Sequence, residues 1–147
     1  MTGIIDANIL VKWFVDEEGA DNARQLQDDR LFAPDLIIVE VTNVLWKKVR
    51  SDSFAASDVG LAIEVIRMAD VILEPGLDLA VRAFEIAHGL NHAVYDCFYL
   101  ALAERRGLPF VTADDKLSRK VDERPFVTTA RIASLSDHVK QRRGVHD

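Results

Sequence analysis

Residues 110–117 read Phe-Val-Thr-Ala-Asp-Asp-Lys-Leu, so a short apolar run leads through two acids into a polar segment. Residues 3–6, Gly-Ile-Ile-Asp, repeat the first half of this pattern near the N-terminus. A short apolar run that ends at a turn residue is typical of a strand buried in a parallel sheet. Ligands of open α/β sheets bind beyond the carboxyl ends of the strands, so Asp6 and Asp114 lie where a site is expected.

The rest of the chain alternates between short apolar runs and longer segments of helical period. We expect further extended segments at 71–73, at 126–127 and around residue 132. We expect helices at 8–14 with Asn8 as cap, 21–29, 34–50, from 57 or 58 to 69, 77–88, 95–106 and 114–121, followed by a polar tail over 138–147. This alternation predicts one α/β domain over residues 1–147, with a central parallel sheet flanked by helices on both faces.

Composition excludes several classes of protein. The chain has 147 residues, 49% of them apolar, which is enough for one ordinary domain without stabilising cross-links. A single cysteine, Cys97, excludes an internal disulfide framework and a four-cysteine zinc site within one chain. The longest apolar run, 97–103, is much shorter than the roughly 20 residues that a membrane span needs. The N-terminus lacks the pattern of a signal peptide, so we expect a cytoplasmic protein.

The charge is unevenly distributed along the chain. The net charge is −6, but the second half of the chain, from residue 74, is neutral and rich in Lys and Arg. Three of these cations, Lys116, Arg119 and Lys120, follow Asp114 on the predicted helix 114–121. Such a basic face is equally consistent with phosphate binding and with an ordinary solvated helix surface.

Two further acids lie on predicted helices. Glu40 interrupts the largely apolar start of the helix 34–50, where a carboxylate is costly unless a polar group or a cation meets it. The alternative is a solvated polar stripe formed by Glu40, Asn43 and Lys47. Asp96 opens the apolar helix 95–106, where an acid is also favoured as a simple helix cap.

Together the four acids predict a metal site. Clustered carboxylates repel one another unless a cation neutralises them, and oxygen ligands of this kind suit Mg²⁺ or Mn²⁺. Such ions support the cleavage of phosphodiesters and let an acidic pocket accept a polyanion. Thr112, two residues before Asp114, points to the same side of its strand and is expected to orient water or an acid.

Four segments resemble, in order, the motifs of PIN-domain nucleases, and their spacing is similar to that of the VapC toxins of VapBC toxin–antitoxin modules. The segments are Asp6-Ala7-Asn8, the run 39–45 with Glu40 and Asn43, the run 95–103 with Asp96, and the run 110–117 with Asp114. The resemblance covers essentially the whole chain, and four motifs in order make it specific.

The resemblance implies an endoribonuclease toxin that requires Mg²⁺ or Mn²⁺ and has a five-stranded parallel sheet. Asp6, Glu40, Asp96 and Asp114 would carry the ion and the catalysis, while Asn8, Asn43 and Thr112 match positions that hold those acids. Asp115 is either a fifth acid of the site or the cap of the helix beginning at Asp114. The implied partners are an RNA substrate, a VapB-like antitoxin that inhibits the enzyme, and a second copy of the chain in a homodimer.

Two other functions remain open at this stage. An Asp after the first strand suits a phosphoryl-transfer domain with Asp6 as nucleophile, although Asn8 stands where a second acid would be expected. The fold is also compatible with a non-catalytic module that binds RNA or protein. His88 and His92 have the spacing of zinc ligands but lack the rest of such a motif, so we interpret both as surface or loop histidines.

Overall fold

The apolar runs at 3–5 and 110–112 form neighbouring strands at the centre of one sheet. The structure is a computed structural model that describes residues 2–144, with only the backbone of residues 142 and 143. Within these residues the strands are β1 (Gly3–Ile5), β2 (Leu31–Pro34), β3 (Val71–Glu74), β4 (Phe110–Thr112) and β5 (Ile132–Ser134). All strand pairs are parallel and the order is β3-β2-β1-β4-β5, which confirms the predicted α/β class.

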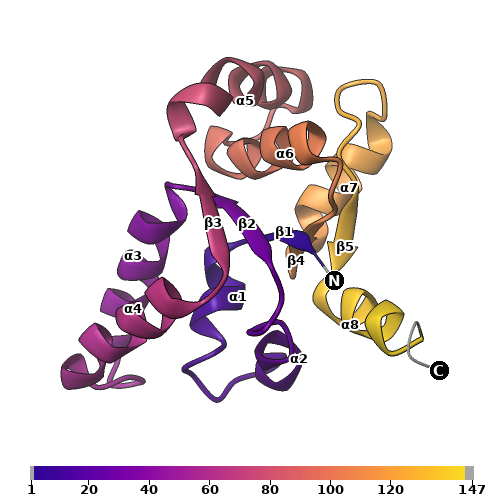
Figure 1. Ribbon diagram of the computed structural model, residues 1–147. Coiled ribbons are helices and arrows are strands. Elements are labelled where there is room, and N and C mark those ends of the chain that lie inside the picture. Colours follow the sequence, from indigo (N-terminus) through magenta and orange to yellow (C-terminus); the bar gives the residue numbers. More distant parts are fainter. Residues whose placement is uncertain (1, 145–147) are drawn as a thin grey trace.

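Helices connect the strands and cover both faces of the sheet (Figure 1). They are α1 (Ala7–Val11), α2 (Ala20–Arg24), α3 (Ile37–Arg50), α4 (Val59–Met68), α5 (Gly76–Leu90), α6 (Val94–Arg106), α7 (Asp115–Glu123) and α8 (Leu135–Gly144), with a 3₁₀ turn η1 (Ala56–Asp58) before α4. Helices α5 and α6 lie on one side of the sheet, and α1, α2 and α8 lie on the other. No helix of the described residues is long and apolar enough to cross a membrane.

The core lies between the sheet and these helices. The middle of helix α6 is buried, and Tyr99, Leu100 and Leu102 are in the core with almost no exposed surface. It ends, as the sequence predicts, at Gly107, whose φ of +63° is the left-handed conformation that glycine tolerates best. Because α6 is rigidly packed, the residues at its N-terminal end have fixed positions relative to the strands.

Three local predictions were wrong. Strand β2 was not expected, because Pro34 and the acid after it signal a helix start; however, the run Leu31–Pro34 is fully buried and paired on both sides, and these sheet contacts outweigh the local signal. Residues 126–127 form a turn rather than an extended segment. The predicted polar tail belongs to α8 as far as residue 144, because His138 and Val139 are buried against the fold, and residues 145–147 lie outside the described chain.

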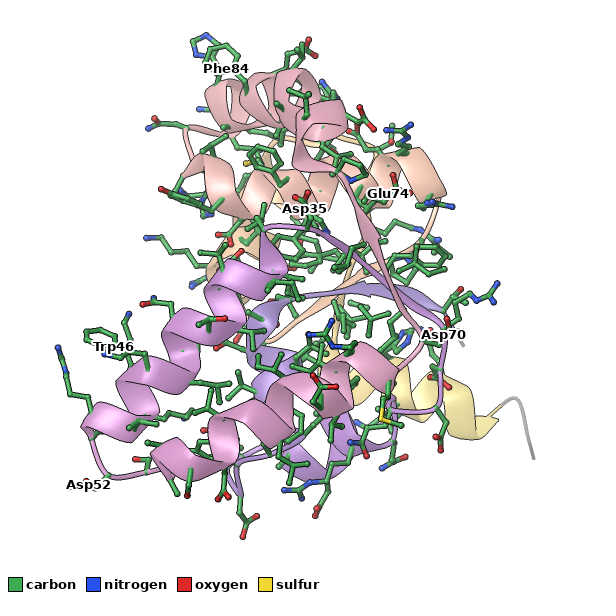
Figure 2. The ribbon with its side chains drawn as sticks, turned by 60° about the vertical axis from the view of Figure 1, so that its left-hand side comes forward. Asp35, Trp46, Asp52, Asp70, Glu74 and Phe84 are labelled. Atoms are coloured by element: carbon green, nitrogen blue, oxygen red, sulfur yellow. The ribbon has the colours of Figure 1, made fainter. Side chains whose placement is uncertain are left out.

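Helix α5 forms as predicted but buries a different face from its most obvious apolar stripe. Its buried residues are Leu79, Ala83, Ile86 and Leu90. The stripe of Leu77, Val81 and Phe84 faces solvent, and Phe84 projects from the outer side of the molecule in Figure 2. Trp46 on α3 is likewise exposed, with the guanidinium of Arg50 over its ring. The fold therefore leaves aromatic surface uncovered on two helices.

Candidate active site

A pocket of about 290 Å³ opens beyond the carboxyl ends of β1 and β4. The chain runs from β1 outward to β2 and β3, then crosses back to β4 on the other side of β1, so the strand order reverses between β1 and β4. This is the position at which open parallel sheets bind ligands. The polar residues that line the pocket are Asp6, Asn8, Glu40, Asp96, Tyr99, Thr112 and Asp114.

Asp6 holds its position through both carboxylate oxygens. Oδ1 accepts a hydrogen bond from the backbone N–H of Ile9 at 3.0 Å, so Asp6 is the N-cap of α1, a role that the sequence had suggested for Asn8. Oδ2 accepts a hydrogen bond from the hydroxyl of Thr112 at 2.7 Å. Burial raises the pKa of Asp6, the bonds from Thr112 and Ile9 oppose that rise, and the charge of Asp96 adds to it. A partly buried acid with a raised pKa beside other acids is typical of a functional site.

Asp114, two residues after β4, is held through one carboxylate oxygen and its backbone N–H. Its Oδ1 accepts hydrogen bonds from the N–H groups of Lys116 and Leu117 at 3.0 and 3.2 Å, which caps α7. Its own N–H donates to the Thr112 hydroxyl at 3.1 Å. Thr112 thus receives a bond from Asp114 and gives one to Asp6, and this shared hydroxyl connects the two acids at the switch point of the sheet.

Glu40 reaches the pocket from α3. The phenol of Tyr99 on α6 donates to Glu40 Oε1 at 3.0 Å, and the Tyr99 ring packs against Phe110. Burial raises the pKa of Glu40, the bond from Tyr99 opposes this, and the charges of Asp96 and Asp6 increase it. The pKa of Tyr99 is also raised, through burial and the neighbouring carboxylate, so the phenol remains a donor at neutral pH. The solvated-stripe interpretation holds for Asn43 and Lys47, which are exposed, but not for Glu40, which is half-buried and lines the pocket.

Asp96 enters the pocket from the first turn of α6. Its Oδ2 lies 2.7 Å from Nε2 of His92. The other ring nitrogen of His92, Nδ1, lies 3.1 Å from the ammonium of Lys120 on α7. Asp96 is not the N-cap of its helix, because the cap residue is Ala93 and makes no side-chain bond.

The structure does not bring every candidate residue to the pocket. Asn8 lines it, whereas Asn43 and Asp115 lie outside its lining, and Asp115 borders a neighbouring depression instead. Lys116 and Arg119 are exposed on α7. Asp115 is the first residue of α7 rather than its cap, since that role belongs to Asp114.

Sequence reasoning missed two neighbours of the acids. Tyr99 was interpreted only as part of an apolar helix, but it stands one turn after Asp96 and therefore shares its face. His92 was interpreted as a surface or loop histidine. It does lie between α5 and α6, yet only 10% of its side chain is exposed and it contacts Asp96, four residues later. Spacing relative to Asp96 was the signal that could have identified both residues.

The donor set of the pocket fits a hydrated divalent cation. Asp6, Glu40, Asp96 and Asp114 offer only carboxylate oxygens, which Mg²⁺ and Mn²⁺ prefer, and mutual repulsion contributes to the raised pKa values of Asp6 and Glu40. Among the described residues, no three Asp, Glu, His or Cys side chains form a preformed metal cage. Mg²⁺ usually retains several waters and binds through one or two carboxylates, so an open arrangement suits it.

Comparison with known proteins identifies the family. Residues 4–123 match the PIN domain family. Ribonuclease VapC9 of Mycobacterium tuberculosis is 36% identical over 97 residues, which are 65% of this chain and 75% of the relative. Ribonuclease VapC3 of Pyrobaculum aerophilum is 30% identical over 121 residues, which are 80% of this chain and 92% of the relative. The chain belongs to the VapC family of PIN domains.

Solved structures support the same fold for this VapC-family chain. The crystal structure of PAE2754 from Pyrobaculum aerophilum superposes with a TM-score of 0.68 at 24% identity, covering 96% of this chain and 88% of that one. A toxin–antitoxin complex from Klebsiella pneumoniae superposes with a TM-score of 0.55 at 16% identity, covering 78% and 88% respectively. The family match and the two VapC relatives confirm the resemblance inferred from the four sequence motifs, and these structures confirm the fold.

Proposed function

We propose that this VapC-family protein is a metal-dependent endoribonuclease and the toxin of a type II toxin–antitoxin module. One observation carries the proposal: four acids from four separate segments line a single pocket at the switch point of the sheet. A fold alone says little about function, but a carboxylate-only site suits a phosphodiester substrate once a cation neutralises it. The names of the two VapC relatives, both called ribonucleases, indicate RNA as that substrate.

In this proposal Asp6, Glu40, Asp96 and Asp114 hold Mg²⁺ or Mn²⁺, directly or through water. When bound, the ion supplies a Lewis acid that neutralises charge on the phosphodiester and a nucleophile at neutral pH. The hydroxyl of Thr112 keeps one oxygen of Asp6 occupied, and the phenol of Tyr99 does the same for Glu40, so each acid presents a defined orientation to the pocket.

The exposed cations of α7 are proposed to bind the RNA backbone. The pocket residue Asp114 caps the N-terminus of α7, so Lys116 and Arg119 lie in the part of the helix nearest to the pocket. In this proposal, an RNA strand with its scissile phosphate in the pocket passes within reach of α7. Each phosphate that a lysine or arginine contacts makes RNA binding more dependent on salt concentration. Lys120, by contrast, is half-buried and already bonded to His92.

The proposed partners follow from the family. We propose that an antitoxin of VapB type inhibits the enzyme by covering the pocket, in line with the structural similarity to a toxin–antitoxin complex. We also propose a homodimer, for which the uncovered stripe of Leu77, Val81 and Phe84 on α5 offers apolar surface. The protein would act in the cytoplasm, where its RNA substrate is found.

The test is cleavage of total cellular RNA by the purified chain, freed of any antitoxin, with Mg²⁺ or Mn²⁺ and with EDTA. The Asp96→Asn variant is run beside it, because it removes a charge from the pocket and keeps the shape of the side chain. Defined fragments that require both the metal and Asp96 would support the proposal. An inert, folded chain would favour the non-catalytic binding module, and a trapped phosphate on Asp6 would favour phosphoryl transfer.

A further inference from the structure

The imidazole of His92 forms a bridge between a pocket acid and a lysine. Its Nε2 lies 2.7 Å from Asp96 Oδ2, and its Nδ1 lies 3.1 Å from the Nζ of Lys120. A lysine ammonium can only donate, so Nδ1 must accept its hydrogen bond and carry a lone pair. Nε2 then carries the proton and donates a hydrogen bond to Asp96. The ring therefore has one defined tautomer, set by its two partners.

Further hydrogen bonds connect helix α7 to the backbone next to His92. The ammonium of Lys120 also donates to the carbonyl of Asn91 at 3.2 Å, immediately before the histidine. One turn later, Arg124 donates to the carbonyl of Gly89 at 2.8 Å. The corner between α5 and α6 is thus tied to the helix whose first turn is capped by Asp114. These bonds connect the start of α6, which carries Asp96, to α7, which Asp114 caps.

We propose that His92 is a positioning residue for the metal site, and that Lys120 serves it by fixing the tautomer rather than by binding RNA. The inference rests on the proposed function, because it assigns Asp96 to a cation. By donating to Oδ2, the ring holds the Asp96 carboxylate in one orientation and leaves the lone pairs of Oδ1 for the ion. Partners that orient a ligating carboxylate in this way typically change metal affinity or activity 10- to 100-fold when they are replaced.

The geometry argues against the other roles of a histidine in such a place. A general base needs a free lone pair directed at the substrate, whereas Nε2 here carries the proton and Nδ1 is occupied by Lys120. An ordinary surface histidine would be widely exposed, as His88 is, whereas the His92 side chain is 10% exposed. His88 instead stacks on Phe84 on the outer face of α5.

Two isosteric substitutions separate the two bonds of the ring. The amide of His92→Gln reaches the position of Nε2 and can still donate to Asp96. The amide of His92→Asn reaches only the position of Nδ1, so it can accept from Lys120 but cannot reach Asp96. His88→Asn is the matched control on the exposed neighbour. The readouts are the dissociation constant for Mn²⁺, measured by calorimetry on the whole chain, and the melting temperature without metal.

We expect His92→Gln and His88→Asn to bind Mn²⁺ within about threefold of wild type, and His92→Asn to bind about 10- to 100-fold more weakly with an unchanged metal-free melting temperature. Equal Mn²⁺ affinity of His92→Asn and wild type would overturn the inference. So would an equal weakening of the Gln and Asn variants together with a lowered melting temperature, because loop packing would then explain both. If His92→Asn does not fold, Lys120→Met replaces it: weaker Mn²⁺ binding supports the bridge, and unchanged binding refutes it.

The Asp96→Asn variant distinguishes this failure from failure of the proposed function. If wild type binds Mn²⁺ and Asp96→Asn does not, the metal site stands, and an unaffected His92→Asn removes only the inference about His92. If wild type binds no Mn²⁺, or Asp96→Asn binds it equally well, the proposed metal site and the inference are both refuted.

Discussion

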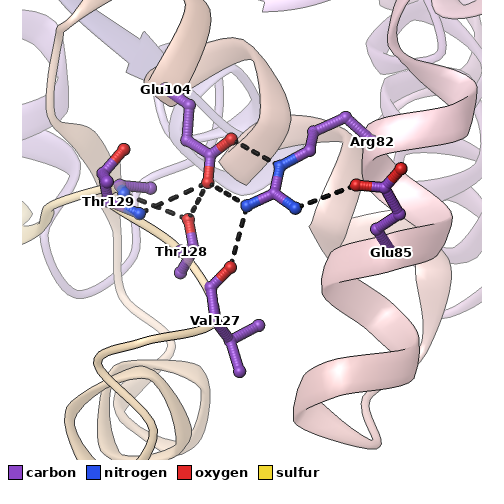
Figure 3. Close-up of polar contacts among 7 residues, drawn as sticks. Arg82, Glu85, Glu104, Val127, Thr128 and Thr129 are labelled. Atoms are coloured by element: carbon purple, nitrogen blue, oxygen red, sulfur yellow. Dashed lines mark hydrogen bonds and ion pairs between the residues drawn. The ribbon is translucent and has the colours of Figure 1, made fainter.

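Replacing Arg82 by methionine is expected to destabilise the chain by about 2–3 kcal/mol at neutral pH. Figure 3 shows the contacts that would be lost. The guanidinium donates to both oxygens of Glu104, from Nε and Nη2 at 2.8 Å each, and to the carbonyl of Val127 at 2.8 Å. Thr128 and Thr129 donate to the same carboxylate, so the loop between α7 and β5 closes onto α5 and α6 there.

The magnitude follows from burial. The Glu104 side chain is 15% exposed and that of Arg82 41%, so solvent screens the pair in part. We therefore expect that losing the Arg82–Glu104 pair costs less stability than the roughly 3–5 kcal/mol of breaking a fully buried pair. The cost should be well above the roughly 0–1 kcal/mol that a surface pair contributes. For a chain of this length the expected fall in melting temperature is about 5–10 °C. Glu85→Gln is the control, because this exposed partner of Arg82 should contribute less than about 0.5 kcal/mol.

The difference in stability between wild type and Arg82→Met should depend on pH in one direction. Burial raises the pKa of Glu104, but the hydrogen bonds from Arg82 and Thr128 more than offset it, and the pKa lies below its ordinary value of 4.5. A lowered carboxyl pKa stabilises the folded chain above the unfolded value, and this stabilisation is lost as the pH falls through the folded value. Thermal melts followed by circular dichroism should therefore show that the difference in melting temperature between wild type and Arg82→Met becomes smaller in acid. A gap of under about 2 °C at neutral pH, or one that widens in acid, would refute the reasoning.

Three further outcomes are expected. Asp6→Asn should cleave RNA at least about 100-fold more slowly yet fold normally, because asparagine caps a helix as well as aspartate does. Asp6→Ala should in addition lower the free energy of unfolding, measured by denaturant titration, by about 1 kcal/mol. Tyr99→Phe should cut about 10-fold more slowly at fixed Mg²⁺, because Glu40 loses the phenol that orients it, and an unchanged rate would contradict that role. Replacing both Lys116 and Arg119 by alanine should raise KM, leave kcat unchanged and flatten the salt dependence of KM; a fall in kcat alone would argue against RNA binding there.

The sequence was most informative where a residue has both a local and a long-range role. Asp6 and Asp114 each follow a strand, and each was consistent either with a helix cap or with a site acid. The structure shows that both are caps and that both line the pocket. Capping fixes the carboxylates by local bonds, so their positions could be predicted from the strand–acid–helix pattern alone.

The remaining parts of the site depend on contacts between distant residues. Tyr99 meets Glu40 across 59 positions of sequence, and Lys120 meets His92 across 28. Hydrophobic period cannot reveal such pairs, because they are set by how α6 packs against α3 and α7. Strand β2 was missed for the opposite reason: the local signal of Pro34 was clear, and sheet pairing on both sides overrode it.

The most direct test of the central claim is anomalous diffraction from crystals of the chain soaked in Mn²⁺. The account predicts a manganese peak inside the pocket at the ends of β1 and β4. Carboxylate oxygens of Asp6, Glu40, Asp96 and Asp114 should bind the ion, either directly or through a water molecule. The peak should disappear in Asp96→Asn crystals. A pocket without manganese at a saturating concentration, or a peak bound only elsewhere on the surface, would contradict the account.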